Sequence, residues 1–111
     1  KNIAVSLFVD PDLEQIEASN IPGVDMIEIN TAKYAEGDIE DIERIQKATQ
    51  LAQSLGLTVA AGHGLTHHNL GLLVREVPDI VEYNIGHSIV SRSIFVGWEK
   101  AILDILTIIN Q

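Results

Sequence analysis

Short apolar runs along the chain alternate with segments in which apolar residues recur every three or four positions. The runs have the length and β-branched content of buried strands, and the longer segments have the periodicity of helices packed on one face. The predicted strands cover residues 4–9, 24–30, 57–61 and about 80–85, and the predicted helices begin after residue 10 and cover residues 38–55, about 67–75, 88–95 and 98–109. Strand and helix are therefore expected to alternate four times.

Single residues mark where several of these elements begin or end. Asp10 is expected to cap a helix whose first position is Pro11, because its side-chain oxygen can accept from the free amides of a first turn. Asp38 is expected to cap the long helix in the same way, and Gly56 to end it where glycine is favoured. The segment before Asp38, through Tyr34, is expected to be a polar loop.

Alternating strands and helices with short connections predict a parallel sheet with right-handed crossovers. Two architectures fit: a free-standing doubly wound sheet, or half of a (β/α)₈ barrel, whose complete form needs twice as many units and roughly 200 residues or more. The chain of 111 residues is long enough for one domain and too short for two. We therefore expect residues 1–111 to form a single α/β unit of the (β/α)₄ type.

The composition is that of a globular protein, with 46% hydrophobic and 21% charged residues. No apolar run approaches the roughly 20 residues that a membrane helix requires, and the opening residues lack a signal-peptide pattern. The absence of cysteine excludes disulfides and thiolate metal sites and fits a cytoplasmic protein. We expect a soluble, cytoplasmic protein.

The formal net charge of −9, with only seven Lys and Arg residues, restricts the possible partners. Nucleic acids and anionic membranes are bound first through clustered positive charge, so neither is expected as a partner. An anionic small molecule would have to be attracted locally. Backbone N–H groups at the N-terminus of a helix can do this without a basic side chain.

The end of the third predicted strand carries the strongest candidate for chemistry, the sequence Gly62-His63-Gly64. Parallel α/β folds place reacting groups at the C-terminal ends of strands, and glycines let the backbone turn sharply and approach a ligand. An imidazole titrates near neutrality, so His63 could act as an acid or a base. The competing interpretation is a loop histidine that is hydrogen-bonded to the backbone.

Two further strand ends carry candidates. Glu28, between two isoleucines, would be costly to bury unless it is paired or stabilises a cationic intermediate, and a structural ion pair is the alternative. Gly86 and His87 precede a helix, so backbone amides there could converge on a phosphate. His63 and His67 could bind zinc only from one helix face, which Gly64 disfavours, so no metal site is expected.

Three motifs in this order resemble the pyridoxine 5′-phosphate synthase family. They are Ile-Glu-Ile-Asn-Thr-Ala-Lys-Tyr-Ala at 27–35, Ala-Gly-His-Gly-Leu-Thr-His-His-Asn at 61–69 and Asn-Ile-Gly-His-Ser-Ile-Val-Ser-Arg at 84–92. The resemblance covers essentially the whole chain, but it reaches only the family's second half, strands five to eight. The sequence departs from the family at Asn30, where relatives often have His, and at Ala32, where they often have Gly.

The resemblance implies a (β/α)₈ barrel that condenses 1-deoxy-D-xylulose 5-phosphate with 3-amino-2-oxopropyl phosphate in vitamin B6 biosynthesis, with no cofactor. It implies that His63 is the proton donor and Glu28 the carboxylate that stabilises the transition state. Gly64, Gly86 and His87 would bind a substrate phosphate. The catalytic residues of the family's first half have no counterpart here, so the isolated chain is expected to be inactive.

An open four-stranded sheet leaves two edges and one apolar face unsatisfied. We therefore expect either a homo-oligomer or association with a complementary half barrel. The alternative function is a non-catalytic phosphate-binding half barrel, either a fragment or an engineered folding module. Another phosphate-binding barrel, such as an aldolase or isomerase, is disfavoured because no lysine lies at a predicted strand end to form a Schiff base.

Overall fold

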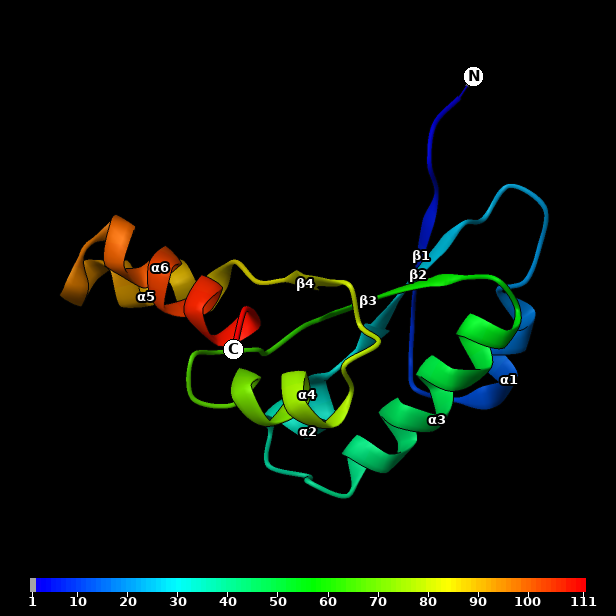
Figure 1. The fold of residues 1–111 in the computed structure, drawn as a ribbon, viewed down its shortest axis with the longest axis horizontal. Coiled ribbons are helices and arrows are strands. Elements are labelled where there is room, and N and C mark those ends of the chain that lie inside the picture. The colour runs from blue at the N-terminus through cyan, green and yellow to red at the C-terminus, as the bar shows by residue number, and fades with distance from the viewer. Residues whose placement is uncertain (1) are drawn as a thin grey trace.

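The computed structural model, which describes residues 2–111, contains one sheet of four parallel strands with helices between them (Figure 1). The strands lie in the order β1-β2-β3-β4, so each strand pairs with the next one along the chain. Their bounds are β1 Ser6–Val9, β2 Met26–Asn30, β3 Thr58–Gly62 and β4 Glu82–Asn84. This α/β sheet has the strand order of half a (β/α)₈ barrel and confirms the predicted parallel topology.

Six helices follow the strands among the described residues. They are α1 Leu13–Ala18, α2 Ala32–Ala35, α3 Asp41–Ser54, α4 Leu70–Glu76, α5 His87–Val96 and α6 Trp98–Ile109. Helices α1 to α4 lie on the same side of the sheet, and α5 and α6 form a pair in which α6 contacts α4 (Figure 1). None of the described helices has both the length and the apolar character needed to cross a bilayer.

The alternation of side chains along β2 divides the sheet into two different faces. Ile27 and Ile29 are fully buried against the helices, whereas Met26, Glu28 and Asn30 point to the other face and are only partly buried. On that second face Phe8, which pairs with Glu28, is 55% exposed. The core therefore lies between the sheet and the helices, and no helix of the described chain covers the opposite face.

Several predicted boundaries were wrong, and side-chain hydrogen bonds explain two of them. The cap of α1 is Asp12, whose carboxylate accepts from the Glu14 amide at 2.9 Å, rather than Asp10. Helix α4 begins at Leu70, so His67 lies in a turn before the helix and not in its first turn. The side chain of Asn69 closes this turn by accepting from the Thr66 amide at 2.8 Å.

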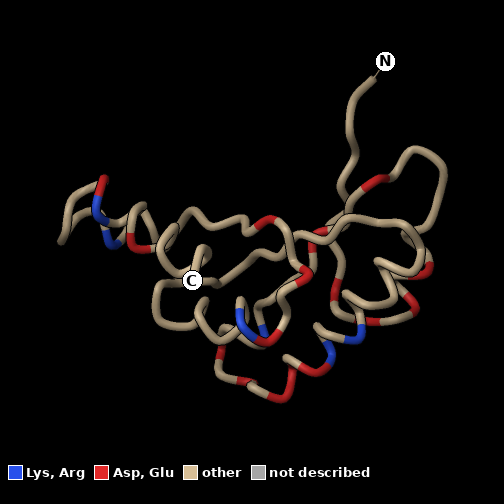
Figure 2. Tube along the Cα trace, in the orientation of Figure 1, with Lys and Arg blue, Asp and Glu red and all other residues tan. Residues whose placement is uncertain are grey.

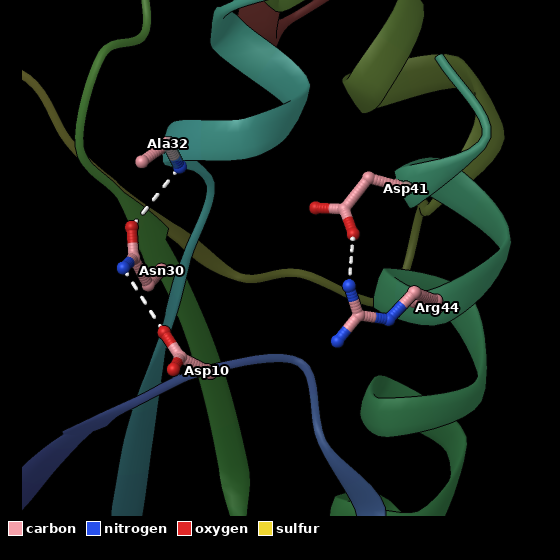
Figure 3. Close-up of polar contacts among 5 residues, drawn as sticks. All are labelled: Asp10, Asn30, Ala32, Asp41 and Arg44. Carbon is pink, nitrogen blue, oxygen red and sulfur yellow. Dashed lines mark hydrogen bonds and ion pairs between the residues drawn. The ribbon is translucent and has the colours of Figure 1, made fainter. Parts of the chain in front are cut away.

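The segment between β2 and α3 differs most from the expectation of a polar loop. It contains the short helix α2, whose Tyr34 is only 5% exposed. Helix α3 starts at Asp41, because Asp38 belongs to a turn in which its carbonyl accepts from the Asp41 amide at 3.1 Å. Asp41 is itself buried and pairs with Arg44 at 3.0 Å (Figure 3).

Candidate active site

The carboxyl ends of three neighbouring strands meet at one edge of the sheet and place the candidate residues together. Asn30, Gly62 and Asn84 are register partners across β2, β3 and β4. The chain turns away from the sheet directly after each of them, so the loops that follow the strands start side by side. This is the edge at which parallel α/β folds keep their reacting groups.

A cavity of about 580 Å³ opens between two of these loops. One wall comes from the loop after β3 and the other from the end of β4 and the start of α5. The lining residues are His63, Gly64, Leu65, Thr66, Asn84, Ile85, Gly86, His87 and Ser88. Four of the five predicted site residues therefore line one cavity, although they come from segments more than 20 residues apart in the sequence.

The fifth predicted residue, Glu28, does not line this cavity but lies beside Gly62, the residue before the first lining residue, His63. Its carboxylate leans across the sheet over Gly62, so that a Cβ atom at residue 62 would lie 2.0 Å from Glu28 Oε1. Only glycine leaves room for a carboxylate in that place. Glu28 is thereby held beside the residue that immediately precedes His63.

His63 has a backbone conformation that is rare for a residue with a side chain. Its φ is 86°, and among residues 2–111 it is the only non-glycine residue with a positive φ. Its side chain is exposed, and the imidazole makes no hydrogen bond to the described part of the chain. The ring is therefore open to a ligand in the cavity, and the interpretation of a histidine bonded to the backbone does not describe it.

The loop that carries His63 is held by hydrogen bonds from residues after β2 and by one bond within the loop itself. The Thr31 hydroxyl lies 2.8 Å from the Gly62 carbonyl and 2.9 Å from the His63 carbonyl. The Asn69 amide group donates to the Gly64 carbonyl at 3.1 Å, and the Tyr34 hydroxyl donates to the Asn69 carbonyl. Burial raises the pKa of Tyr34, so its hydroxyl remains protonated and able to donate.

The far wall of the cavity is the start of α5. Ser88 donates from its hydroxyl to the Leu65 carbonyl at 2.7 Å and so ties this helix to the loop after β3. The first amides of a helix have no partner within it and favour an anion. Gly86 has open space where a Cβ would stand, so the fold itself does not require glycine there.

No Lys or Arg side chain of residues 2–111 lines the cavity, and Figure 2 shows the basic residues of this range scattered without a cluster. Arg92, which follows in α5, is engaged with Asp104 at 2.6 Å. The groups in the cavity that could donate to an anion therefore include the first amides of α5 and the ring N–H groups of His63 and His87. Within residues 2–111, no three side chains of the metal-binding types gather in one place.

Asn30 and Ala32, the two positions at which the sequence departs from the family it resembles, contact each other. The Asn30 side-chain oxygen accepts from the Ala32 amide at 3.0 Å, at the start of α2 (Figure 3). Its side-chain nitrogen donates to Asp10 at 3.1 Å, which links the end of β1 to the end of β2. Asn30 therefore fixes the start of α2 beside the site.

Comparison with known proteins agrees with the motifs over the full length of the chain. The family model described as "Pyridoxal phosphate biosynthesis protein PdxJ" matches residues 1–111. The chain belongs to this family. Its relatives include proteins named pyridoxine 5′-phosphate synthase from Idiomarina loihiensis, 42% identical over 98% of this chain, and Aquifex pyrophilus, 46% identical over 94%. A third, from a Hydrogenobaculum species, is 47% identical over 97% of this chain.

The chain spans about half the length of these PdxJ relatives, 47% to 48% of each. Glycines at strand ends led to the prediction of His63, Gly64, Gly86 and His87, and all four line the cavity. The contacts of Thr31 and Tyr34 with the His63 loop were not predicted. A threonine directly after a strand was a visible signal, but its partners lie on another strand and cannot be read from local sequence.

Proposed function

We propose that this chain is the C-terminal half of a pyridoxine 5′-phosphate synthase. The complete enzyme would condense 1-deoxy-D-xylulose 5-phosphate with 3-amino-2-oxopropyl phosphate. The observation that carries the proposal is the cavity that brings His63 and Gly64 together with Gly86 and His87, beside the Glu28 carboxylate. Membership of the PdxJ family supports the same assignment.

In this proposal His63 donates a proton to a departing oxygen of the condensing substrate. The role fits an exposed imidazole that no described side chain engages, because an imidazolium is a competent acid near neutral pH. Glu28 stabilises the positive charge of an intermediate formed between amine and carbonyl. Its carboxylate lies on the open face of the sheet, where such an intermediate would be enclosed by the rest of a barrel.

The start of α5 binds a substrate phosphate in this proposal. The amides after Gly86 and the side chain of His87 supply the attraction, since none of the described Lys and Arg residues lines the cavity. This accounts for anion binding by a chain with a net charge of −9. Most of the acidic residues lie on α1, α3 and the loops (Figure 2), whereas Asp104 on α6 lies beside α5 and pairs with Arg92 at 2.6 Å.

The site is completed by a second half barrel. The strands β1 and β4 are edges of the sheet, and the face that carries Phe8 and Glu28 is not covered by the chain's own helices. We propose that the remaining length seen in the relatives supplies the other strands. A second copy of this chain is the alternative partner, and light scattering that finds only monomers would exclude it.

The test is product formation from the two phosphorylated substrates by this chain alone, and by this chain mixed with a separately produced N-terminal half of the Aquifex pyrophilus relative. We expect pyridoxine 5′-phosphate only from the mixture, because cooperating groups lose most of their effect when part of a site is absent. In the mixture His63→Asn should lower kcat by at least about 100-fold, the scale of general acid catalysis.

The matched control is His68→Asn, which alters a nearby exposed histidine outside the cavity and should leave the rate unchanged. No product from the mixture, with the intact relative active, would overturn the assignment. Product from the chain alone would show that the second half is not needed for the site.

A non-catalytic phosphate-binding half barrel is the second candidate, because the cavity wall that would bind phosphate is complete within this chain. Calorimetry with inorganic phosphate separates the two. The second candidate predicts binding that survives His63→Ala, is lost when Gly86 is replaced by a bulky residue, and is accompanied by no turnover in any mixture.

A further inference from the structure

The residue that follows β2 controls the turn that follows β3. We propose that Thr31 is a positioning residue that sets the backbone conformation of His63 and thereby the direction from which its imidazole enters the cavity. This inference rests on the proposed role of His63 as a proton donor. Thr31 would touch no reacting atom, so its effect would pass entirely through His63.

The contacts of Thr31 are directed at this one turn. Its side chain is fully buried, and its hydroxyl lies within hydrogen-bond distance of both the Gly62 and the His63 carbonyl, at 2.8 and 2.9 Å. Its backbone amide also donates to the Gly62 carbonyl at 2.9 Å. The hydroxyl has a single proton, so it bonds one carbonyl at a time, and the His63 carbonyl has no other partner among the hydrogen bonds of the described chain.

The conformation that Thr31 faces needs such support. With φ of 86°, His63 has a backbone conformation that residues other than glycine rarely adopt. Such a conformation persists only when the surrounding structure stabilises it. Gly64 follows with φ of 78°, and a Cβ there would lie 2.6 Å from the Ala35 Cβ. The turn is therefore packed closely against α2.

Residues after β2 hold both ends of the His63 loop. Thr31 bonds its beginning, and Tyr34 bonds the Asn69 carbonyl at its end. Asn69 in turn bridges the loop internally through the Gly64 carbonyl and the Thr66 amide. The position of the proposed proton donor is thus determined by the neighbouring strand and its short helix, rather than by the strand that carries it.

Loss of the hydroxyl would allow residue 63 to relax toward an ordinary negative φ. That change rotates the Cα–Cβ direction relative to the cavity and moves the imidazole away from a bound substrate. The start of α5, which follows β4 and forms the other wall of the cavity, would remain in place. We therefore expect a fall in kcat without a matching change in KM.

The experiment compares Thr31→Val, which keeps the side-chain shape and removes the hydroxyl, with Thr31→Ser, which restores the hydroxyl. In the mixture with the Aquifex pyrophilus half, Thr31→Val should lower kcat by about 10- to 100-fold, the effect of a misplacement near 1 Å, with KM within about twofold. Thr31→Ser should recover most of kcat. The matched control is Thr49→Val, which alters another buried threonine, on α3, whose hydroxyl has no partner among the described residues.

A second measurement on the chain alone is independent of activity. The Cα and Cβ NMR chemical shifts of His63 report its backbone dihedrals, and they should change in Thr31→Val but not in Thr31→Ser or Thr49→Val. If Thr31→Val does not fold, Thr31→Ala removes the hydroxyl without placing a second methyl group beside the carbonyls, and it carries the same expectations.

Unchanged His63 shifts in the hydroxyl-free variant would overturn the inference, as would a kcat equal to that of Thr49→Val. Absence of product from the unmodified mixture would instead reject the proposed function. The His63 shifts would still decide whether Thr31 sets the turn.

Discussion

Gly62→Ala tests whether the Glu28 carboxylate acts in catalysis from the position that it has in the structure. The new Cβ would lie 2.0 Å from Glu28 Oε1, 3.1 Å from its Cδ and 3.2 Å from the Asn84 carbonyl oxygen. Ordinary van der Waals contact begins near 3.4 Å, so the carboxylate must move by about 1.4 Å. The Asn84 carbonyl needs to yield by only a few tenths of an ångström.

The two effects of this methyl group differ in size. A flexible carboxylate can swing aside, so the free energy of unfolding should fall by no more than about 2 kcal/mol, within the range for modest overpacking. Catalysis depends on position, and a misplacement of this order costs about 100-fold in rate, equivalent to about 2.7 kcal/mol in activation free energy. The loss in activation free energy should therefore exceed the loss in the free energy of unfolding.

The assay measures kcat/KM in the mixture of halves and urea unfolding of the chain alone. Gly71→Ala is the matched control, because a Cβ there meets only ordinary contacts at 3.6 Å or more and the residue lies inside α4. We expect it to be as active as the unmodified chain and more stable by about 0.5–1 kcal/mol. Activity of Gly62→Ala within twofold of this control would refute the assigned position of Glu28.

Two further predictions concern stability. Thr49→Val replaces a buried hydroxyl that has no partner in the described chain by a methyl group, so it should raise the free energy of unfolding by about 1 kcal/mol. A lower free energy of unfolding in urea would mean that the hydroxyl is hydrogen-bonded. Burial, the Arg92 guanidinium and His68 hold the pKa of His67 below its usual value of 6.5, with Asp104 opposing them. The folded state therefore binds this proton less readily than the unfolded state, and His67 contributes stability above pH 6.5 that is lost as the pH falls below it. His67→Gln should weaken the loss of stability between about pH 7 and pH 5, and an identical pH profile would contradict this.

The parts of the fold that could be predicted are those with a repeating pattern. Ile27 and Ile29 belong to a short apolar run that predicted a strand over residues 24–30, and the structure has β2 within that range. Helix α2 was missed because four residues are too few to show a period. The starts of α1 and α4 were misplaced because Asp12 and Asn69 form local side-chain bonds that compete with the expected caps.

The candidate site likewise has parts that local sequence could predict and parts that it could not. Glycines at the ends of β3 and β4 predicted His63 and His87 as candidates, because strand ends in a parallel sheet converge. Thr31 contacts Gly62 and His63, which lie 31 and 32 positions further along the chain. This contact depends on the register between β2 and β3. The same register brings Glu28 over Gly62. Such contacts follow from strand pairing and have no local signature.

The order of the strands also affects how the sheet folds and how further βα units could be added to it. Because each strand pairs with the one before it in the chain, every new βα unit adds to an edge that already exists, and no pair has to open to admit it. Each pairing closes a loop of a single βα unit, so its entropic cost is smaller than in a sheet whose neighbouring strands are distant in sequence. By the same logic, further units can be joined at β1 or at β4 without altering any contact within the present four, and a barrel can be enlarged from a half in small inheritable steps.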